Sequence, residues 1–259
     1  MASPCLELRD VAMRYGEGKR GVAALESISL AVEEREFVTI VGPSGCGKST
    51  LLYLVGGFLR PTGGEILLRG RPISGPGRDR GIVFQRYSLF PWLTVAANIA
   101  YGLEEQGMGR AERDRVVDDH VRLVHLEGFK DRYPRELSGG MQQRVALAQT
   151  LACNPEMLLM DEPFGALDAQ TRRILQDELR RIWQRNTKTV LFVTHDVEEA
   201  VALGTRIVVM AARPGRIKEV VKRDFDVRDG DEFDANPAFV DLKLRIWRSV
   251  KEEVEAARA

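Results

Sequence analysis

The sequence predicts an α/β fold with a mainly parallel sheet, an N-terminal antiparallel β subdomain and an inserted α-helical subdomain. Three observations support this. Short runs that are apolar on both faces, typical of buried parallel strands, alternate with helical stretches. Residues 1–75 hold β-rich runs separated by turn signals. A charged segment with helical periodicity interrupts the alternation at residues 89–153.

The N-terminal segment favours an antiparallel sheet. Strands are expected in LELRDVAMRY (6–15), ISLAVEE (28–34) and EILLRGRPI (65–73), which are rich in strand-forming residues. Between the second and third lies FVTIV (37–41), which is apolar on both faces. FVTIV is therefore expected to be a buried parallel strand.

Later apolar runs predict the other strands of the parallel sheet. They are GIVF (81–84), MLLM (157–160), TVLFVT (189–194) and RIVVM (206–210). In the insert, valines recur at near-helical spacing at positions 116, 117, 121 and 124.

We expect one domain over residues 1–225, with core segments 1–88 and 154–225 around the insert 89–153. The tail, 226–259, includes an amphipathic helix from Pro237 onward. Its apolar face is expected to cap the domain rather than lie on a membrane, with Trp247 beside that face. The residues of the face are Phe239, Leu242, Ile246, Val250 and Val254.

Composition and hydropathy favour an ordinary globular chain over a membrane-spanning or secreted one. Of the 259 residues, 44% are hydrophobic and 29% charged, as in an ordinary globular protein. The formal net charge of zero gives no argument for nucleic acid as a partner. No apolar run approaches the roughly 20 residues that span a bilayer, and the N-terminus lacks the regions of a signal peptide. Three widely spaced cysteines fit a reducing compartment, so we expect a cytosolic chain that meets a membrane through a partner.

GPSGCGKST, which follows the FVTIV run, matches the P-loop pattern and predicts a P-loop NTPase core. Its glycines let backbone N–H groups surround phosphate, and the following helix adds the positive end of its dipole. Lys48 would reach the β- and γ-phosphates, and the Ser49 hydroxyl would ligate Mg²⁺. This motif alone fits kinases, GTPases and ATPases. The predicted phosphate-binding residues are Gly42, Pro43, Ser44, Gly45, Cys46, Gly47, Lys48, Ser49 and Thr50.

A second acidic site follows the MLLM run. Asp161 ends a buried strand, so its carboxylate is expected at the carboxyl edge of the sheet, where it would hold Mg²⁺. Glu162 comes next and would polarise a water for in-line attack on the γ-phosphate. The alternative is a solvated loop, which Pro163 makes less favourable by fixing the turn.

LSGGMQQR (137–144) offers a second phosphate cradle. Ser138 and the N–H groups of Gly139 and Gly140 would form an anion-binding helix start. Since the P-loop already surrounds one side of a triphosphate, this cradle would reach the ATP of a second copy in a head-to-tail, two-fold pair. Taken alone, Ser138 also fits an N-capped helix without a ligand.

Along the chain, GPSGCGKST comes first, LSGGMQQR second and the acidic site after MLLM third. With its motifs in this order, the segment 6–220 resembles the ATP-binding cassette (ABC) family, specifically the nucleotide-binding subunit of a membrane transporter. The resemblance implies an ATPase that uses ATP and Mg²⁺. It matches Gln85 to a residue that contacts Mg²⁺ and the attacking water, and His195 to one that contacts the γ-phosphate and steadies the catalytic glutamate. It places Asp168 in the loop that crosses the dimer interface. It matches Tyr15 to an adenine-stacking aromatic, although an ordinary strand tyrosine is a close rival.

The same resemblance implies partners. An aromatic cluster of Tyr87, Phe90 and Trp92 would lie near the groove that receives a permease, so we expect integral-membrane permease subunits and, indirectly, an extracytoplasmic solute-binding protein. ARPGRI (212–217) resembles the nitrate/sulfonate/taurine-type importers, and the short C-terminal part leaves no room for the β domain of sugar-type importers. The chain would then be cytoplasmic and peripheral on the inner face of the membrane, with a small anion as the transported molecule.

Two other functions compete with a transport ATPase. A soluble cassette acting on DNA or ribosomes usually has two cassettes or long coiled coils, and neither occurs here. A P-loop kinase of small molecules would leave LSGGMQQR and His195 without a role.

Cys46 gives one further hypothesis. Because it precedes a helix N-terminus, its thiol is expected to have a lowered pKa and to be shielded from alkylation by ATP.

Overall fold

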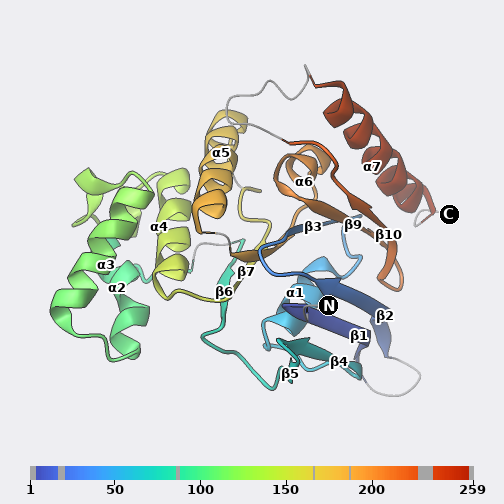
Figure 1. Ribbon diagram of the computed structural model, residues 1–259, viewed down its shortest axis with the longest axis horizontal. Coiled ribbons are helices and arrows are strands. Elements are labelled where there is room, and N and C mark those ends of the chain that lie inside the picture. Colours follow the sequence, from blue (N-terminus) through green and yellow to red (C-terminus); the bar gives the residue numbers. More distant parts are fainter. Residues whose placement is uncertain are drawn as a thin grey trace. The chain divides into compact units, whose positions relative to one another are not determined.

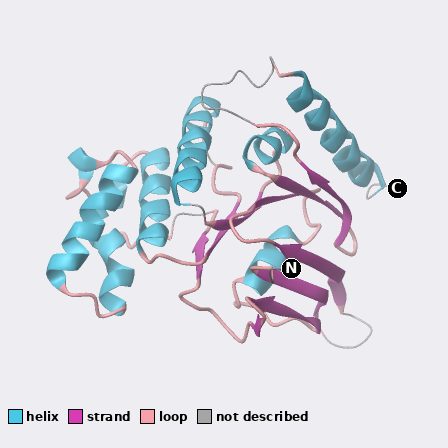
Figure 2. Ribbon diagram, viewed as in Figure 1, coloured by secondary structure: helices cyan, strands magenta, loops and turns pink. Residues whose placement is uncertain are grey.

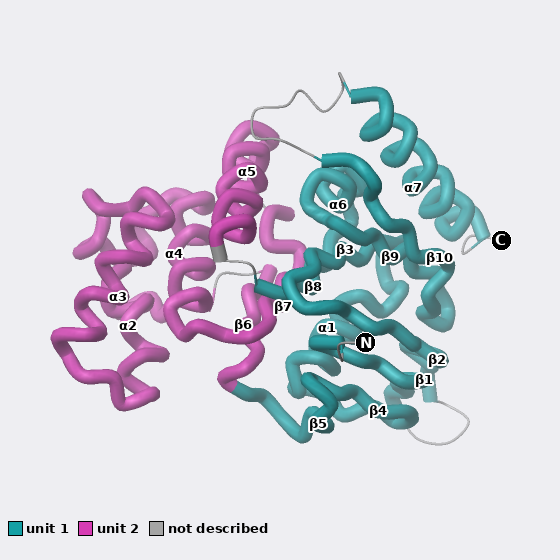
Figure 3. The backbone as a smooth tube through the Cα atoms, viewed as in Figure 1, with its two compact units in different colours: residues 1–77, 188–259 teal, residues 78–187 magenta. Residues whose placement is uncertain are grey.

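The computed structural model describes residues 4–16, 21–85, 88–165, 167–186, 188–226 and 236–256. The chain divides into two compact units, residues 1–77 with 188–259 and residues 78–187 (Figure 3). Both units contain strands and helices, which confirms the α/β class (Figure 2).

The first unit contains the predicted antiparallel sheet. Its strands are β1 (Leu6–Tyr15), β2 (Val22–Val32), β4 (Gly63–Leu68) and β5 (Arg71–Pro72), in the order β2-β1-β4-β5 (Figure 1). Each pairing is antiparallel. Leu6 and Leu8 of β1 are buried at alternate positions, as expected for a strand with one covered face.

The same unit contains strands of the parallel sheet. β3 (Phe37–Val41) lies between β8 (Thr189–Val193) and β9 (Arg206–Ala211) and is parallel to both, so FVTIV is a buried parallel strand as predicted. β10 (Arg216–Lys222) pairs antiparallel with β9 and was not predicted. α1 (Lys48–Val55) follows β3, and α6 (Val197–Leu203) follows β8.

The C-terminal helix α7 (Pro237–Ala256) packs its predicted apolar face inward. Phe239 and Ile246 are fully buried in a cluster with residues of α6 and β9, and Leu242 and Val250 lie at the edge of that cluster. Trp247 is 51% exposed, outside the packed face. The helix therefore caps this unit by apolar burial.

The second unit joins two strands to helices. β6 (Arg80–Val83) is parallel to β7 (Met157–Asp161). The helices are α2 (Val95–Glu105), α3 (Arg110–Leu123), α4 (Gly139–Ala152) and α5 (Ala169–Asn186), with short 3₁₀ turns at Glu127–Phe129 and Pro134–Glu136.

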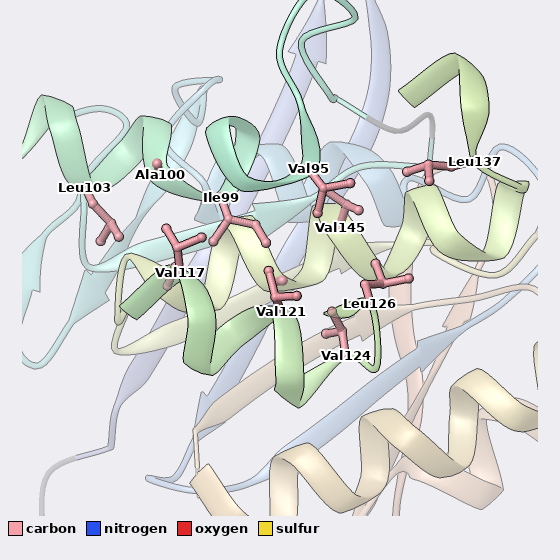
Figure 4. Close-up of a cluster of buried hydrophobic side chains, with 12 residues drawn as sticks. Val95, Ile99, Ala100, Leu103, Val117, Val121, Val124, Leu126, Leu137 and Val145 are labelled. Atoms are coloured by element: carbon pink, nitrogen blue, oxygen red, sulfur yellow. The ribbon is translucent and has the colours of Figure 1, made fainter. Parts of the chain in front are cut away.

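A core of aliphatic side chains holds α2, α3 and α4 together (Figure 4). Val117, Val121 and Val124 are buried in it and Val116 packs against it, as the helical spacing predicted. The compact unit also includes β6, β7 and α5, so it is longer than the predicted insert 89–153. The predicted domain boundaries stay a prediction. No helix in the described part of the chain is both long and apolar enough to cross a membrane.

Candidate nucleotide site

The P-loop wraps through backbone conformations that require glycine. Gly45 and Gly47 have φ angles of 77° and 94°, in the left-handed region. A Cβ on Gly47 would also lie 2.5 Å from Leu25 Cδ2. α1 begins directly after Gly47, which has no side chain to cap the first-turn N–H groups. A glycine-rich loop followed by first-turn N–H groups without a side-chain cap can bind a phosphate group through its backbone.

The side chain of Lys48 folds back on its own loop. Lys48 is 6% exposed, and its Nζ donates to the carbonyl oxygens of Gly42 at 2.9 Å and Pro43 at 3.2 Å. The loop thus holds one ammonium group within its curve, where a polyanion would be attracted.

Cys46 contradicts the sequence-based expectation for its pKa. The residue is fully buried, and burial raises the pKa of its thiol. Lys48, whose Nζ lies 4.0 Å from Cys46 Sγ, opposes the rise but does not outweigh it. The expectation was wrong because loss of water around the thiolate exceeds the help of nearby positive charge.

A glycine outside the motif also supports the P-loop. Gly215 follows β9, and its N–H donates to Ala24 O at 3.0 Å while its carbonyl accepts from Glu26 N–H at 3.0 Å. A Cβ on Gly215 would lie 2.1 Å from Cys46 O. In the sequence, ARPGRI stands out only as a subgroup feature, because the contact of Gly215 with Cys46 joins residues far apart in the chain.

His195 lies beside the P-loop within the first unit. Ile40 of β3 pairs with Val193 of β8, and Gly42 and His195 each lie two residues beyond that pair. Both are thus at the carboxyl edge of adjacent parallel strands, where α/β proteins bind ligands. His195 is exposed at that edge.

Tyr15 is also brought to the P-loop. Its hydroxyl lies 3.4 Å from Thr50 Oγ1, and 44% of the residue is exposed. An exposed ring at this place is compatible with stacking on a base. Its role in adenine binding stays a prediction.

The second unit gathers three predicted residues of the hydrolytic site. Asp161 ends β7 and is 4% exposed. Glu162 has a φ of 44°, an uncommon conformation that costs a residue with a Cβ about 1–2 kcal/mol. Gln85 Nε2 donates to Glu162 Oε2 at 3.5 Å, so the two side chains meet.

LSGGMQQR forms a capped helix start. Ser138 is exposed at the N-cap of α4, and its Oγ accepts from Met141 N–H at 3.3 Å. Gly140 is buried, and a Cβ there would lie 2.6 Å from Thr171 Cγ2 of α5. Gly140 therefore also permits close packing of α4 on α5. Both alternatives for Ser138, a phosphate contact and a cap alone, fit this geometry.

Asp168 uses its carboxylate locally. It accepts the N–H groups of Gln170 at 3.1 Å and Thr171 at 3.0 Å at the start of α5. The bonds from Thr171 are the main cause that lowers the pKa of Asp168. The residue is exposed, and its predicted place at a dimer interface stays a prediction.

The predicted magnesium ligands are a hydroxyl, a carboxylate and an amide, from Ser49, Asp161 and Gln85. Oxygen donors of this kind suit Mg²⁺, which also takes nucleotide phosphates and water. In the described part of the chain, no three His, Cys, Asp or Glu side chains gather as a metal cluster. A magnesium ion bound with ATP does not require such a cluster.

The mixed α/β fold and its P-loop define the chain as a nucleotide-binding protein. The family model described as "ABC transporter" matches residues 25–165. The chain belongs to the ABC transporter family and is an ABC-type ATPase.

Relatives cover nearly the whole chain. An uncharacterized ABC transporter ATP-binding protein of Methanocaldococcus jannaschii is 54% identical over 234 residues, 90% of this chain and 86% of the relative. The nitrate import ATP-binding protein NrtD of Synechocystis is 52% identical, covering 82% and 80%. The taurine import ATP-binding protein TauB of Rhizobium johnstonii is 46% identical, covering 96% and 95%.

A solved structure matches the fold. It is a dimeric ATP-binding cassette in a post-hydrolysis state bound to ADP and Pi, 35% identical, with a TM-score of 0.75. The match covers 85% of this chain and all of the other. The predicted fold class and ATPase activity are thereby confirmed.

Proposed function

We propose that this chain is the ATPase subunit of an import system for a small anion such as nitrate, a sulfonate or taurine. The observation that carries the proposal is the identity of 52% and 46% to chains named nitrate and taurine import ATP-binding proteins. The chain would lie on the cytoplasmic side of the membrane, where it would bind separate permease subunits. An extracytoplasmic solute-binding protein would deliver the transported molecule to those subunits.

The proposed hydrolytic step uses residues of both units of the fold. The P-loop binds the phosphates of ATP, with Lys48 at the β- and γ-phosphates and Ser49 at the metal. Asp161 and Gln85 would hold Mg²⁺ together with Ser49, and the ion would supply positive charge beside the phosphates. The Glu162 carboxylate would accept a hydrogen bond from the attacking water and so polarise it, and His195 would contact the γ-phosphate.

The proposed dimer places Ser138, Gly139 and Gly140 of one copy on the ATP of the other. Exposure of Ser138 at the start of α4 supports this, since a partner can reach it. The solved relative with ADP and Pi is a dimer. ATP would then join the two copies, and hydrolysis would release them.

The proposed permease contact is an aromatic cluster in the second unit. The ring of Phe90 lies 5.6 Å from that of Trp92 and 4.4 Å from that of Tyr101. Trp92 is 70% exposed and Tyr101 is 40% exposed, which favours an interaction surface. Tyr87, also expected here, lies outside the described residues.

The proposal is tested with a tagged chain purified from detergent-solubilised membranes of its own cells. A multi-span membrane protein should copurify, and the complex in liposomes should take up nitrate, a sulfonate or taurine when ATP and solute-binding protein are present. Recovery with ribosomes or DNA and without a membrane protein would contradict the transport function.

Glu162→Gln serves as the matched control in the same assay. The variant should bind ATP normally but lose turnover by roughly 100-fold or more, within the 10²–10⁴ that general base catalysis contributes. Uptake should stop with it. Normal hydrolysis by Glu162→Gln would remove the role proposed for this carboxylate.

A further inference from the structure

A buried hydrogen-bonded network lies directly next to His195. Thr194 is 1% exposed and Glu199 is 3% exposed. The Thr194 hydroxyl donates to Glu199 Oε2 and accepts from Asp196 N–H at 3.0 Å. Burial of a carboxyl group is costly unless it is paired, so this pair is a specific feature of the turn.

The same turn is fixed to the strand that enters the P-loop. Thr194 N–H donates to Ile40 O at 3.1 Å, at the end of β3. One turn into α6, Ala200 O accepts from the hydroxyl of Thr39, also on β3, at 3.1 Å. Strand β3 thus holds both ends of the segment that carries His195.

The side of the turn that leads into α6 is fixed as well. Asp196 caps the helix, because its carboxylate accepts the N–H groups of Glu198 at 2.9 Å and Glu199 at 3.2 Å. His195 is the exposed residue between two held neighbours, Thr194 and Asp196. Its backbone orientation therefore depends on the bonds that hold them.

We propose that Thr194 and Glu199 are positioning residues that aim His195 at the γ-phosphate of ATP. The inference rests on the proposed function, since it assumes that His195 acts on ATP. Without the bond between Thr194 and Glu199, the turn gains freedom and His195 leaves its productive orientation. ATP binding by the P-loop would persist, because its backbone contacts do not involve this pair.

The first test compares Thr194→Val with Thr194→Ser. Valine keeps the shape and removes the hydroxyl, whereas serine keeps the hydroxyl. Thr194→Val should lower kcat by about tenfold or more, within the ~100-fold that misplacing a catalytic group by 1 Å can cost, with KM for ATP little changed. Thr194→Ser should restore kcat. Equal kcat values for Thr194→Val and the unmodified chain would overturn the inference.

A double-mutant cycle separates positioning from general damage. In a His195→Ala background, Thr194→Val should have little further effect, because the two residues act through one group. An equal loss in both backgrounds would overturn the inference. If His195→Ala alone hydrolyses ATP normally, the role of His195 in the proposed function fails instead.

A spectroscopic test does not depend on turnover. The chain has three histidines, so the Cε1–H resonance of His195 can be assigned by substitution. Glu199→Leu keeps helix propensity but removes the acceptor of the Thr194 hydroxyl. In the folded variant the His195 resonance should shift while those of His120 and His125 stay. An unmoved His195 resonance would overturn the inference.

Discussion

At the scale of single residues, the nucleotide site is shaped by what lies against the P-loop backbone. Gly47 is required by its left-handed φ and by Leu25, and Gly215 by the carbonyl of Cys46. The first requirement is visible in the motif, whereas the second comes from a segment more than a hundred residues later. A P-loop sequence is therefore not sufficient for its own geometry.

Gly215→Ala should damage the P-loop although the residue is outside the motif. The new Cβ would lie 2.1 Å from Cys46 O and 2.9 Å from Ala24 O, so backbone must move. Overpacking of this kind costs about 1–3 kcal/mol. Thermal unfolding should show a lower Tm, and a fluorescent ATP analogue should bind about tenfold or more weakly, the factor that ~1.4 kcal/mol represents.

Gly75→Ala is the matched control, because a Cβ there meets no atom within 4 Å. It should bind the analogue like the unmodified chain. Equal binding by Gly215→Ala and Gly75→Ala would show that the loop tolerates displacement at Cys46.

At the scale of helices and strands, the sequence predicted the elements whose pattern is local. FVTIV and MLLM are apolar on both faces, and both are buried parallel strands. β10 was not predicted because its sequence, RIKEVVK, is partly exposed along its length and has no continuous apolar run.

The nucleotide site, like the strands, was predictable only where its residues form a local pattern in the sequence. P-loop residues and the cap Ser138 are encoded in contiguous motifs, and the structure places them at helix starts. The network of Thr194 and Glu199 and the contact of Gly215 depend on tertiary packing, which has no local signal. The predicted lowering of the Cys46 pKa was wrong for the same reason, because the burial that raises it does not follow from the residues next to Cys46 in the sequence.

The packing of α4 on α5 should make stability depend on pH through Glu178. This carboxylate lies 3.1 Å from Arg144 Nε, and both side chains are largely buried. Burial raises the pKa of Glu178 from its ordinary value of 4.5, and Arg144 partly opposes the rise. Because the folded chain holds this proton more tightly than the unfolded chain, the contribution of Glu178 to stability falls as pH rises above 4.5.

Glu178→Gln removes that titration. Urea unfolding at about pH 4 and about pH 7 should show the variant gaining stability relative to the unmodified chain as pH rises. Glu105→Gln, at an exposed position on α2, is the control and should show little change. A pH-independent difference for Glu178→Gln would contradict the prediction.

At the scale of the whole molecule, one copy of the chain is proposed to hold half of each catalytic centre. The P-loop and His195 lie in the first unit, and the exposed helix start at Ser138 lies in the second. If ATP joins the P-loop of one copy to Ser138 of another, turnover per molecule should fall on dilution, because the pair is concentration-dependent.

Substitutions of Ser138 test this pairing while separating it from the cap of α4. In a Glu162→Gln background, ATP should convert the chain from monomer to dimer in size-exclusion chromatography with light scattering. Adding Ser138→Arg should block the dimer by bulk, while monomers still bind ATP. Gln184→Arg, at an exposed position on α5, adds the same charge and should leave the dimer intact.

Ser138→Asp gives the sharper result. Aspartate is as good an N-cap as serine, so α4 should keep its start, but its negative charge would face the γ-phosphate of the partner-bound ATP. The carboxylate and the γ-phosphate would repel each other, so the ATP-dependent dimer should be lost. The fold and the affinity of the monomer for ATP should be retained. A Ser138→Asp chain that dimerises with ATP as readily as its serine counterpart would show that Ser138 only caps a helix, and each catalytic centre would then have to be complete within one copy.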